Sequence, residues 1–250
     1  MKNLRFVLLK SAYDCWKNPL TQDLLMQTIN LKLQGYGREY AYGTLPIDTF
    51  DFVGTQHLVC QEEANGKLSV IMGYKTSTLK RSRLHNLTFH GLAILENSGA
   101  TEHAAAVRKI LADCERSETE ISYDGSWTMA PAAHQDRDLA RHLKEVMAAI
   151  QVFYHEQEGV NQIIGFGMLR FKTDQYFKNL GYQAVCGNDG QPLPPFRMST
   201  LQHEPAVLLH LTRFTDIARA RAAKLESIWS NRLVIDVQDA AAERIFKAAA

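Results

Sequence analysis

The clearest hydrophobic periodicity of the chain lies in residues 139–153. Apolar side chains recur there at i, i+4, i+7, i+11 and i+14, which places them on one face of an α-helix. They are Leu139, Leu143, Val146, Ile150 and Phe153. A polar turn after Pro131 precedes the pattern, and Gly159 supplies a C-terminal stop. The pattern predicts a long amphipathic helix that starts near Gln135 and ends at Gly159.

Short apolar or alternating segments predict the strands of a sheet. These segments are residues 5–12, 57–63, 67–79, 119–130, 161–169, 183–187 and 206–214. Asn65-Gly66 separates the second segment from the third, and this dipeptide is typical of a tight antiparallel hairpin. Gly125 interrupts the alternation of the fourth segment, and a glycine inside a strand predicts a β-bulge.

The remaining segments predict further helices and two loops. Helical patterns cover residues 20–34, 103–116, 172–182 and 217–229. Residues 35–55, rich in glycine and aromatic side chains, are predicted as a long ordered loop, and residues 187–196 as an irregular one. Because neither a repeat nor a linker is visible, we expect a single domain over 1–250 with a C-terminal helical extension over about 215–250.

Composition and charge are those of an ordinary globular protein. Apolar residues make up 46% of the chain and charged residues 22%, which predicts a packed core. Lys and Arg number 28 against 27 Asp and Glu, so the net charge of +1 gives no overall attraction to nucleic acid. No segment approaches the length of a membrane span. We expect neither a nucleic-acid partner nor an integral membrane segment.

The cysteines and histidines predict neither a disulfide framework nor a metal site. Cys15, Cys60, Cys114 and Cys186 lie far apart and form no CxxC pair, which favours a reducing, cytoplasmic location. None of the nine histidines lies at HxH or HxxxH spacing. A Gly-x-Ser-x-Gly motif that would mark a serine nucleophile is also missing from the sequence.

The start of the long helix is a candidate anion site. A helix N-terminus presents unpaired N–H groups and the positive end of its dipole, and both favour a phosphate. The residues concerned are Gln135, Asp136, Arg137, Asp138, Leu139, Ala140 and Arg141. Asp138 would oppose an anion and could cap the helix amides itself, whereas Arg137 and Arg141 would offset its charge. A capped helix without a ligand is the alternative interpretation.

The order of the elements resembles the Gcn5-related N-acyltransferase (GNAT) superfamily. In that family the turn after the fourth strand reads Arg/Gln-x-x-Gly-x-Gly/Ala, and its amides bind the diphosphate of an acyl-thioester cofactor. Gln135 and Ala140 match the first and last positions, and Asp138 stands where glycine is usual. The resemblance also implies that main-chain amides near Met129 and Ala130 receive the thioester carbonyl, where two strands splay apart.

A second stretch, residues 176–182, is similar to the Phe-Tyr-x-x-Leu-Gly-Phe ending of the same family. Its sequence is Tyr-Phe-Lys-Asn-Leu-Gly-Tyr. Many members use the second aromatic residue, a tyrosine, to protonate the departing thiolate. Phe177 occupies that position without a proton to give and is expected as a cofactor contact. Tyr176, which would face differently on a helix, is the candidate catalytic hydroxyl, although a thiolate can leave without a general acid.

The first part of the chain resembles the branch of acyl-homoserine-lactone synthases and N-acyl amino acid synthases. Asp48-x-x-Asp51 precedes the hairpin as in that branch, and Lys75 stands where the branch has an arginine. Asp124-x-x-Trp127 replaces the Glu-x-x-Arg motif of the fourth strand. The resemblance implies that Asp48, Asp51, Lys75 and Trp127 contact substrate. Alternatively, the two aspartates only form a surface turn.

Together these features predict an α/β protein with a GNAT-like mixed, twisted sheet, helices on both faces and a splayed strand pair. The resemblance implies an N-acyltransferase that moves an acyl group from acyl-CoA or an acyl-carrier protein to a primary amine, such as that of an amino acid or its derivative. Asp124, or secondly Glu120, would take the proton of the amine. The alternative is a non-catalytic GNAT-like binding or regulatory module that has lost the cofactor.

A basic segment offers a surface for the carrier protein. Lys80, Arg81 and Arg83 follow the predicted hairpin and could receive the acidic surface of such a partner. Otherwise they form an ordinary exposed charged face.

Overall fold

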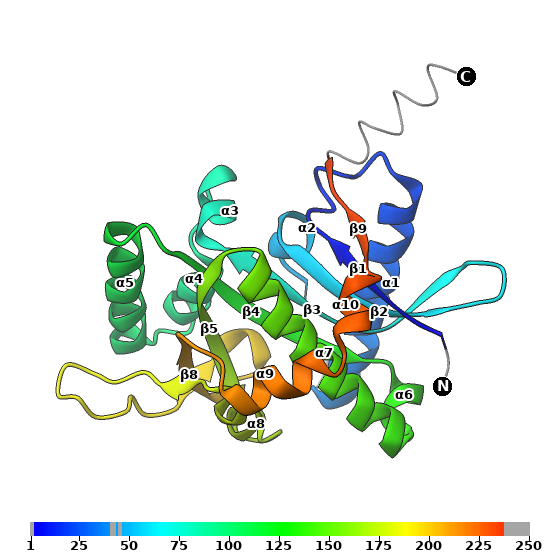
Figure 1. The fold of residues 1–250 in the computed structure, drawn as a ribbon. Coiled ribbons are helices and arrows are strands. Elements are labelled where there is room, and N and C mark those ends of the chain that lie inside the picture. The colour runs from blue at the N-terminus through cyan, green and yellow to red at the C-terminus, as the bar shows by residue number, and fades with distance from the viewer. Residues whose placement is uncertain (1–2, 41–43, 45–46, 238–250) are drawn as a thin grey trace.

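The computed structural model of the protein describes residues 3–40, 44 and 47–237. Within these residues, nine strands form one mixed sheet in the order β6-β8-β5-β4-β3-β2-β1-β9, and β7 pairs with β8 (Figure 1). The strands are β1 (Leu4–Leu9), β2 (Thr55–Glu62), β3 (Leu68–Thr78), β4 (Glu120–Met129), β5 (Val160–Met168), β6 (Gln183–Ala184), β7 (Phe196–Met198), β8 (Glu204–Leu211) and β9 (Leu233–Ile235). The predicted mixed α/β sheet and the β2–β3 hairpin are confirmed.

Helices surround the sheet and connect its strands. They are α1 (Pro19–Glu39), α2 (Phe50–Val53), α3 (Leu79–Leu84), α4 (His90–Asn97), α5 (Thr101–Arg116), α6 (Pro131–Gln135), α7 (Arg137–Gln157), α8 (Thr173–Leu180), α9 (Asp216–Ala223) and α10 (Glu226–Ser230). A 3-10 turn, η1, spans Ser199–Leu201. In the described part of the chain, no helix combines the length and the hydrophobicity needed to cross a bilayer.

Helices cover both faces of the sheet, as the alternation of β1 shows. Phe6 and Leu8 pack in one core with α7, whereas Val7 and Leu9 pack in another with α1. Farther along the sheet, α8 and α9 continue the α7 layer, and α4 and α5 continue the α1 layer (Figure 1). The prediction of helices on both faces is therefore confirmed.

Two adjacent parallel strands, β4 and β5, separate in the middle of the sheet. They pair from Glu120 with Val160 as far as Asp124 with Gly165. Beyond that point β4 follows β3, up to Met129, and β5 follows β8 instead. The predicted splayed strand pair is confirmed, and the gap between the two strands opens after Asp124.

A bulge in β4 lies where the strands begin to separate. Lys75 of β3 faces Gly125 while Gly73 faces Thr128, so β4 has one extra residue in this interval. Ser126 takes a left-handed conformation with φ of 60°. The extra residue reverses the alternation of side chains, so Trp127 turns toward α8 and Thr128 toward α1. The sequence prediction of a bulge at Gly125 is confirmed within one residue.

The predicted loop over residues 35–55 is wrong at both ends. Helix α1 continues through Gly35 and Gly37 to Glu39, and α2 forms just before β2. A Cβ atom at Gly35 would lie 2.8 Å from Oγ1 of Thr128, so glycine lets the end of α1 approach β4 closely. Residues 41–43 and 45–46 of the predicted loop lie outside the described residues.

The C-terminal segment also differs from the helical extension that the sequence predicts. Helices α9 and α10 are present, but β9 follows them and pairs in parallel with β1 at the edge of the sheet. Residues 238–250 lie outside the described part of the chain. The segment after α10 is therefore part of the sheet as far as Ile235.

Candidate active site

A cavity of about 700 Å³ opens where β4 and β5 separate. Trp127 and Met129 line it from β4, and Phe166 and Met168 line it from β5. This volume is within the usual range of small-molecule sites. The walls of the cavity are therefore the two strand segments that no longer pair with each other.

The cavity connects the two faces of the sheet. Tyr176 and Phe177 of α8 line it on the α7 side. Tyr36 of α1 and His90 and Ile94 of α4 line it on the opposite side. A cavity between unpaired strands that is lined from both helical layers can hold an extended ligand with a different group on each face of the sheet.

The start of α7 differs from the predicted phosphate site. Helix α6 occupies the predicted turn, and Asp136 is the N-cap of α7. The carboxylate of Asp136 accepts hydrogen bonds from the amides of Asp138 and Leu139, at 3.1 and 3.0 Å. Asp138 does not cap the helix, because its side chain is 90% exposed and lies 3.5 Å from Arg141. Two of the amides expected to bind a diphosphate are therefore occupied by Asp136.

The other residues of this segment surround that cap. Gln135 and Arg137 are exposed, and Leu139 and Ala140 are half-buried. The amide of Ala140 donates to the main-chain carbonyl of Asp136, at 2.8 Å. The guanidinium groups of Arg137 and Arg141 thus remain at the surface beside the helix start, where they can reach an anion.

Only one of the two amides predicted for the thioester carbonyl faces the gap. The Ala130 amide donates to the carbonyl of Ile71 in β3, at 2.8 Å, which contradicts its predicted role. Successive N–H groups of a strand point to opposite edges, so the amide of Met129 points away from β3 and toward the gap. Met129 therefore stays a candidate, whereas Ala130 does not.

The first candidate base, Asp124, is the centre of a buried polar network. Its oxygens accept four hydrogen bonds, from Thr76, Ser122, Gln151 and His155, at 2.9 to 3.0 Å. Burial alone would raise the pKa of Asp124, but the charge and hydrogen bond of His155 outweigh it and lower the pKa. A carboxylate has about four lone-pair positions, so all of them are in use. This occupancy argues against Asp124 as the group that takes a proton from substrate.

The second candidate base lies far from the cavity. Glu120 begins β4, and its carboxylate accepts a hydrogen bond from the amide of Lys80, at 3.1 Å. Five residues of extended strand, roughly 16 Å, separate it from Gly125, where the gap opens. The structure therefore does not bring Glu120 to the reacting groups.

The aromatic pair on α8 lies at the cavity, but the hydroxyl of Tyr176 is already engaged. It donates to the main-chain carbonyl of Lys144, at 2.9 Å, and burial raises its pKa above the usual value of 10.0. Phe177 packs edge-on against Trp127, with ring centroids 5.7 Å apart. Both residues therefore shape the wall of the cavity, and neither offers a free proton donor in this arrangement.

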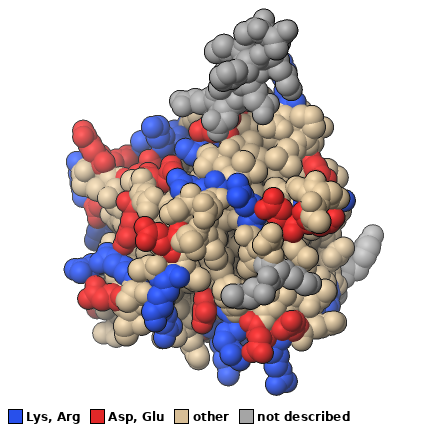
Figure 2. Space-filling model, turned by 45° about the vertical axis from the view of Figure 1, so that its right-hand side comes forward, with Lys and Arg blue, Asp and Glu red and all other residues tan. Residues whose placement is uncertain are grey.

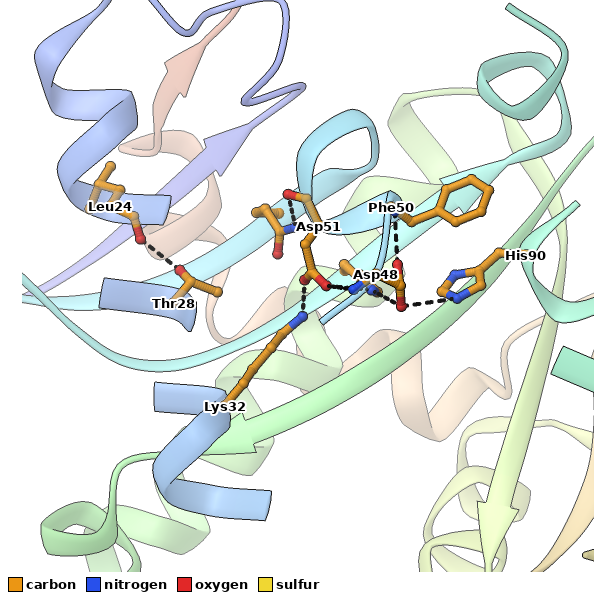
Figure 3. A network of polar contacts seen from close by, with 9 residues as sticks. Leu24, Thr28, Lys32, Asp48, Phe50, Asp51 and His90 are labelled. Carbon is orange, nitrogen blue, oxygen red and sulfur yellow. Dashed lines mark hydrogen bonds and ion pairs between the residues drawn. The ribbon is translucent and has the colours of Figure 1, made fainter. Parts of the chain in front are cut away.

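Three predicted substrate residues, Asp48, Asp51 and Lys75, form one charged cluster, and Asp48 lines the cavity. Figure 3 shows Asp48 and Asp51 of this cluster. The ammonium group of Lys75 lies 2.6 Å from Asp48 and 2.9 Å from Asp51. Lys32, which the sequence analysis missed, pairs with the other oxygen of Asp51 from α1. Lys32, Asp51 and Lys75 are buried, whereas the side chain of Asp48 is 42% exposed and lines the cavity. We call these residues, together with His90, the Asp48 cluster.

Burial and neighbouring charges shift the pKa values in the Asp48 cluster. Burial, and secondly the charge of Lys75, lower the pKa of Lys32 to about 8. Burial alone would raise the pKa of Asp48, but the hydrogen bond from His90 and the charge of Lys75 lower it well below 3.8. Asp48 is therefore an anion at neutral pH, and it is the charge of the cluster that faces the cavity.

The surface charge is mixed. Figure 2 shows acidic and basic side chains interspersed over the visible face, without a large patch of one sign. In α3, Arg81 pairs with Asp14 and Arg83 pairs with Glu115. Part of the basic segment predicted for a carrier protein is therefore neutralised within the chain. Among the described residues, no group of three or more His, Cys, Asp or Glu side chains is arranged to hold a metal ion.

Comparison with solved structures shows the fold. The chain is similar to BjaI, a CoA-dependent acyl-homoserine lactone synthase solved with SAM and isopentyl-CoA, at 15% identity over 93% of each chain and a TM-score of 0.52. It is also similar to the synthase LasI, at 12% identity over 94% of this chain and 98% of LasI, with a TM-score of 0.50. No known sequence family and no curated protein matches the sequence.

These similarities extend over nearly the whole chain. The CoA-dependent synthase MesI gives the same result, with 13% identity, 93% of this chain and 100% of MesI covered, and a TM-score of 0.50. The resemblance to the GNAT fold, and to its acyl-homoserine-lactone synthase branch, is therefore confirmed for the fold.

Proposed function

We propose that the protein is an N-acyltransferase that moves an acyl group from a pantetheine thioester to a primary amine, such as that of an amino acid or its derivative. The cavity between β4 and β5 carries this proposal. Because residues from both helical layers line it, the pantetheine arm could lie beside α8 and the acceptor beside α1 and α4. The shared fold with CoA-dependent synthases supports the same reaction class.

The residues of the gap suit the binding of a thioester. The amide of Met129 faces the gap and can donate to a carbonyl oxygen, which favours the charge that develops on that oxygen. Trp127 stacks on Tyr74, with ring centroids 4.9 Å apart, and provides a rigid apolar wall for the pantetheine arm. Arg137 and Arg141 can bind the diphosphate of CoA or the phosphate of a carrier protein's prosthetic group.

The side chain of Asp136 must move away from the helix amides before these amides can bind a phosphate. Its carboxylate occupies the amides of Asp138 and Leu139, and an entering phosphate would repel it. We infer that the phosphate either displaces the Asp136 side chain or binds the arginines alone. The experiment must determine whether the donor is acyl-CoA or an acyl-carrier protein.

A thermal-shift and product assay tests the proposal. The purified protein is mixed with acyl-CoA of several chain lengths, or with acyl-carrier protein, and its melting temperature is measured, because a ligand of the native state stabilises it. The same donors are then incubated with primary amines and amino acids, and the products are identified by mass spectrometry. A raised melting temperature together with an N-acyl product is expected. No shift and no product with any donor would refute the proposal.

Three observations favour a second candidate, a GNAT-like module without catalysis. Asp136 blocks two helix amides, Phe177 carries no proton, and the hydroxyl of Tyr176 is engaged. Such a module would bind a partner or regulate one. It predicts that acyl-CoA leaves the melting temperature unchanged, or that it binds without release of free thiol during prolonged incubation with amines.

A further inference from the structure

The hydroxyl of Tyr123 lies at the closed end of the gap between β4 and β5. Tyr123 and Ile164 form the pair before the last one that joins the two strands, and Tyr123 lines the cavity. A Cβ atom at Gly125, where the gap opens, would lie 2.7 Å from the hydroxyl oxygen of Tyr123. The glycine therefore leaves the space that this hydroxyl occupies.

Close contacts hold the ring of Tyr123. It meets the ring of His90 edge-on, with centroids 4.8 Å apart, and the ring of Phe166 at a tilt, with centroids 5.0 Å apart. A Cβ atom at Gly91 would lie 3.1 Å from Cδ2 of Tyr123, so the start of α4 packs directly on the ring. A ring enclosed in this way keeps its hydroxyl in one position.

The hydroxyl of Tyr123 has no partner within the described residues but keeps contact with the cavity. Only 6% of Tyr123 is exposed, and no hydrogen bond joins its hydroxyl to another described residue. The hydroxyl of Tyr74, by contrast, is sealed in the core. Burial raises the pKa of Tyr123 well above 10.0, so its hydroxyl keeps the proton and can donate it in a hydrogen bond. An unpaired hydroxyl in such a place is unfavourable, and an oxygen of a ligand would pair it.

The thioester carbonyl is too far away to be this partner. Lys75 of β3 faces Gly125. Met72, three residues earlier in β3, faces Met129, so roughly 10 Å of strand separate the hydroxyl of Tyr123 from the Met129 amide. A carbonyl oxygen bound by that amide lies only about 3 Å from it. The partner of Tyr123 therefore belongs to the acceptor, on the α1 and α4 side of the cavity.

The same separation limits the size of the acceptor. The roughly 10 Å contain two hydrogen bonds of about 3 Å each and the approach of the amine nitrogen to the thioester carbon, at about 3–3.5 Å. Only a few ångströms remain between the amine nitrogen and the oxygen that Tyr123 binds. An oxygen about two to four bonds from the amine, as in an amino acid derivative, satisfies this spacing.

The charges on this side of the cavity favour an uncharged oxygen. Asp48 is an anion that faces the cavity, and it lies 3.3 Å from the His90 ring that contacts Tyr123 (Figure 3). A carboxylate bound at Tyr123 would be repelled by Asp48. Arg38 is the only Lys or Arg among the described residues that line the cavity, and it pairs with Glu39. The carbonyl of an amide or ester avoids the repulsion.

We propose that Tyr123 recognises the acceptor by donating a hydrogen bond to an uncharged oxygen close to the acceptor's amine. The preferred acceptors are then amides or esters of amino acids, rather than alkylamines or free amino acids. The inference rests on the function proposed above and names the class of its acceptor. A fixed donor discriminates against a substrate without the matching oxygen, because the donor is then left unpaired. Tyr123 acts in this way as a specificity residue and transfers no proton.

The variant Tyr123→Phe, assayed with matched amines, tests this proposal. For each of several amino acid side chains, the acceptors are the amide, the free amino acid and the amine that lacks the carbonyl group, and the acyl donor is the same throughout. We expect Tyr123→Phe to lower kcat/KM about tenfold or more for the amides and less than about twofold for the plain amines. The ratio of variant to wild type cancels the intrinsic reactivity of each amine. In the wild type, the amides should exceed the free amino acids.

Melting temperatures separate this role from a structural one. Without ligand, Tyr123→Phe should melt at the wild-type temperature or above it, because the missing hydroxyl has no protein partner. Tyr182→Phe is the matched control. The hydroxyl of Tyr182 accepts a hydrogen bond from Gln151, at 2.8 Å, and Tyr182 does not line the cavity. This variant should melt at a lower temperature and keep the wild-type ratio of amide to amine.

The outcomes distinguish the role of Tyr123 from the proposed function. Equal losses with amides and plain amines would place the hydroxyl at the acyl donor, and no loss with either would mean that it binds no substrate. Both results would overturn the proposal and leave the acyltransferase function standing. Free amino acids that match their amides in the wild type would overturn the preference for an uncharged oxygen. A wild-type protein that acylates no amine with any donor would instead refute the proposed function itself.

Discussion

The carboxylate of Asp136 accepts a hydrogen bond from the amide of Leu139, at 3.0 Å, and so closes the start of α7. The residue that stands in the glycine position of the GNAT pattern, Asp138, points away into solvent. The obstacle to phosphate binding is therefore two residues earlier than the motif indicates. An aspartate that caps a helix is also the residue whose charge an entering phosphate meets first.

Replacement of Asp136 by serine should strengthen the binding of CoA. Serine still caps a helix but carries no charge, so the helix start keeps its structure and loses its repulsion toward phosphate. We expect the Kd for CoA, measured by isothermal titration calorimetry, to fall roughly three- to fivefold in Asp136→Ser. Asp138→Ser is the matched control, and its effect should be smaller. Identical Kd values for the two variants would contradict this account.

Among the residues of the Asp48 cluster, replacement of Asp51 should lower the stability of the protein most. Asp51→Asn removes the buried charge that contacts both Lys32 and Lys75, and leaves two buried ammonium groups with one partly exposed partner. The free energy of unfolding in urea should fall by about 3–5 kcal/mol. Lys32→Met is the control and should cost less, because Asp51 keeps Lys75. A loss below about 1 kcal/mol for Asp51→Asn would argue against the cluster.

The protein should lose stability as the pH falls below about 6.5. Burial lowers the pKa of His57 to about 3, so between pH 6.5 and 3 the unfolded chain binds a proton that the folded chain does not. The stability that neutral His57 provides is present above pH 6.5 and is lost toward pH 3, by up to about 1.4 kcal/mol per pH unit. Below about pH 4 the low pKa of Asp48 and Asp124 adds to the loss.

The variant His57→Phe isolates that contribution. Phenylalanine can keep the aromatic stack on Tyr74, whose ring lies 4.2 Å from that of His57, but it cannot be protonated. Unfolding in urea at several pH values from 4 to 7 should give a shallower decline for the variant than for the wild type, whatever the variant's stability at pH 7. Parallel curves would mean that His57 does not titrate between the two states.

Two glycines should respond to alanine in opposite ways. A Cβ at Gly167 of β5 would lie 2.5 Å from Cα of Asp174, so Gly167→Ala should push α8 off the sheet and cost roughly 1–3 kcal/mol. A Cβ at Gly37 of α1 would meet nothing within 4 Å, and Gly37→Ala should stabilise by about 0.5–1 kcal/mol. Urea denaturation of both variants checks the signs. A stable Gly167→Ala protein would mean that α8 is not tightly seated on β5.

The sequence predicts the elements whose signals are local. The periodicity that ends at Gly159 and the Asn65-Gly66 dipeptide predict α7 and the hairpin, and both are present. The end of α1 was missed because Gly35 and Gly37 have low helix propensity, and only the contact of Gly35 with β4 explains the helix there. Helix α7 starts at Arg137, two residues after the predicted start near Gln135, because α6 occupies the preceding turn.

The sequence predicted Asp48, Asp51 and Lys75 of the Asp48 cluster, but it did not predict Lys32 or His90. Asp48 and Asp51 are only three positions apart, so their motif is visible in the sequence. Lys32 lies four positions after the buried Thr28, on the apolar side of α1, and this position was its only signal. His90 has no such pattern, because its neighbours Asp48 and Tyr123 are 42 and 33 positions away along the chain. Only the fold brings these three residues together.

The location of the donor thioester is the central claim, and a crystal structure with a stable acyl-CoA thioether tests it most directly. The thioether is a 2-oxoalkyl derivative of CoA, which keeps a carbonyl group but has no reactive carbonyl–sulfur bond, so the ligand persists during crystallisation. We predict that its pantetheine arm lies between Met129 of β4 and Met168 of β5, with the acyl carbonyl toward the Met129 amide and the side chain of Asp48 on the opposite face. A ligand bound elsewhere, or a cavity without ligand at saturating thioether, would contradict the account.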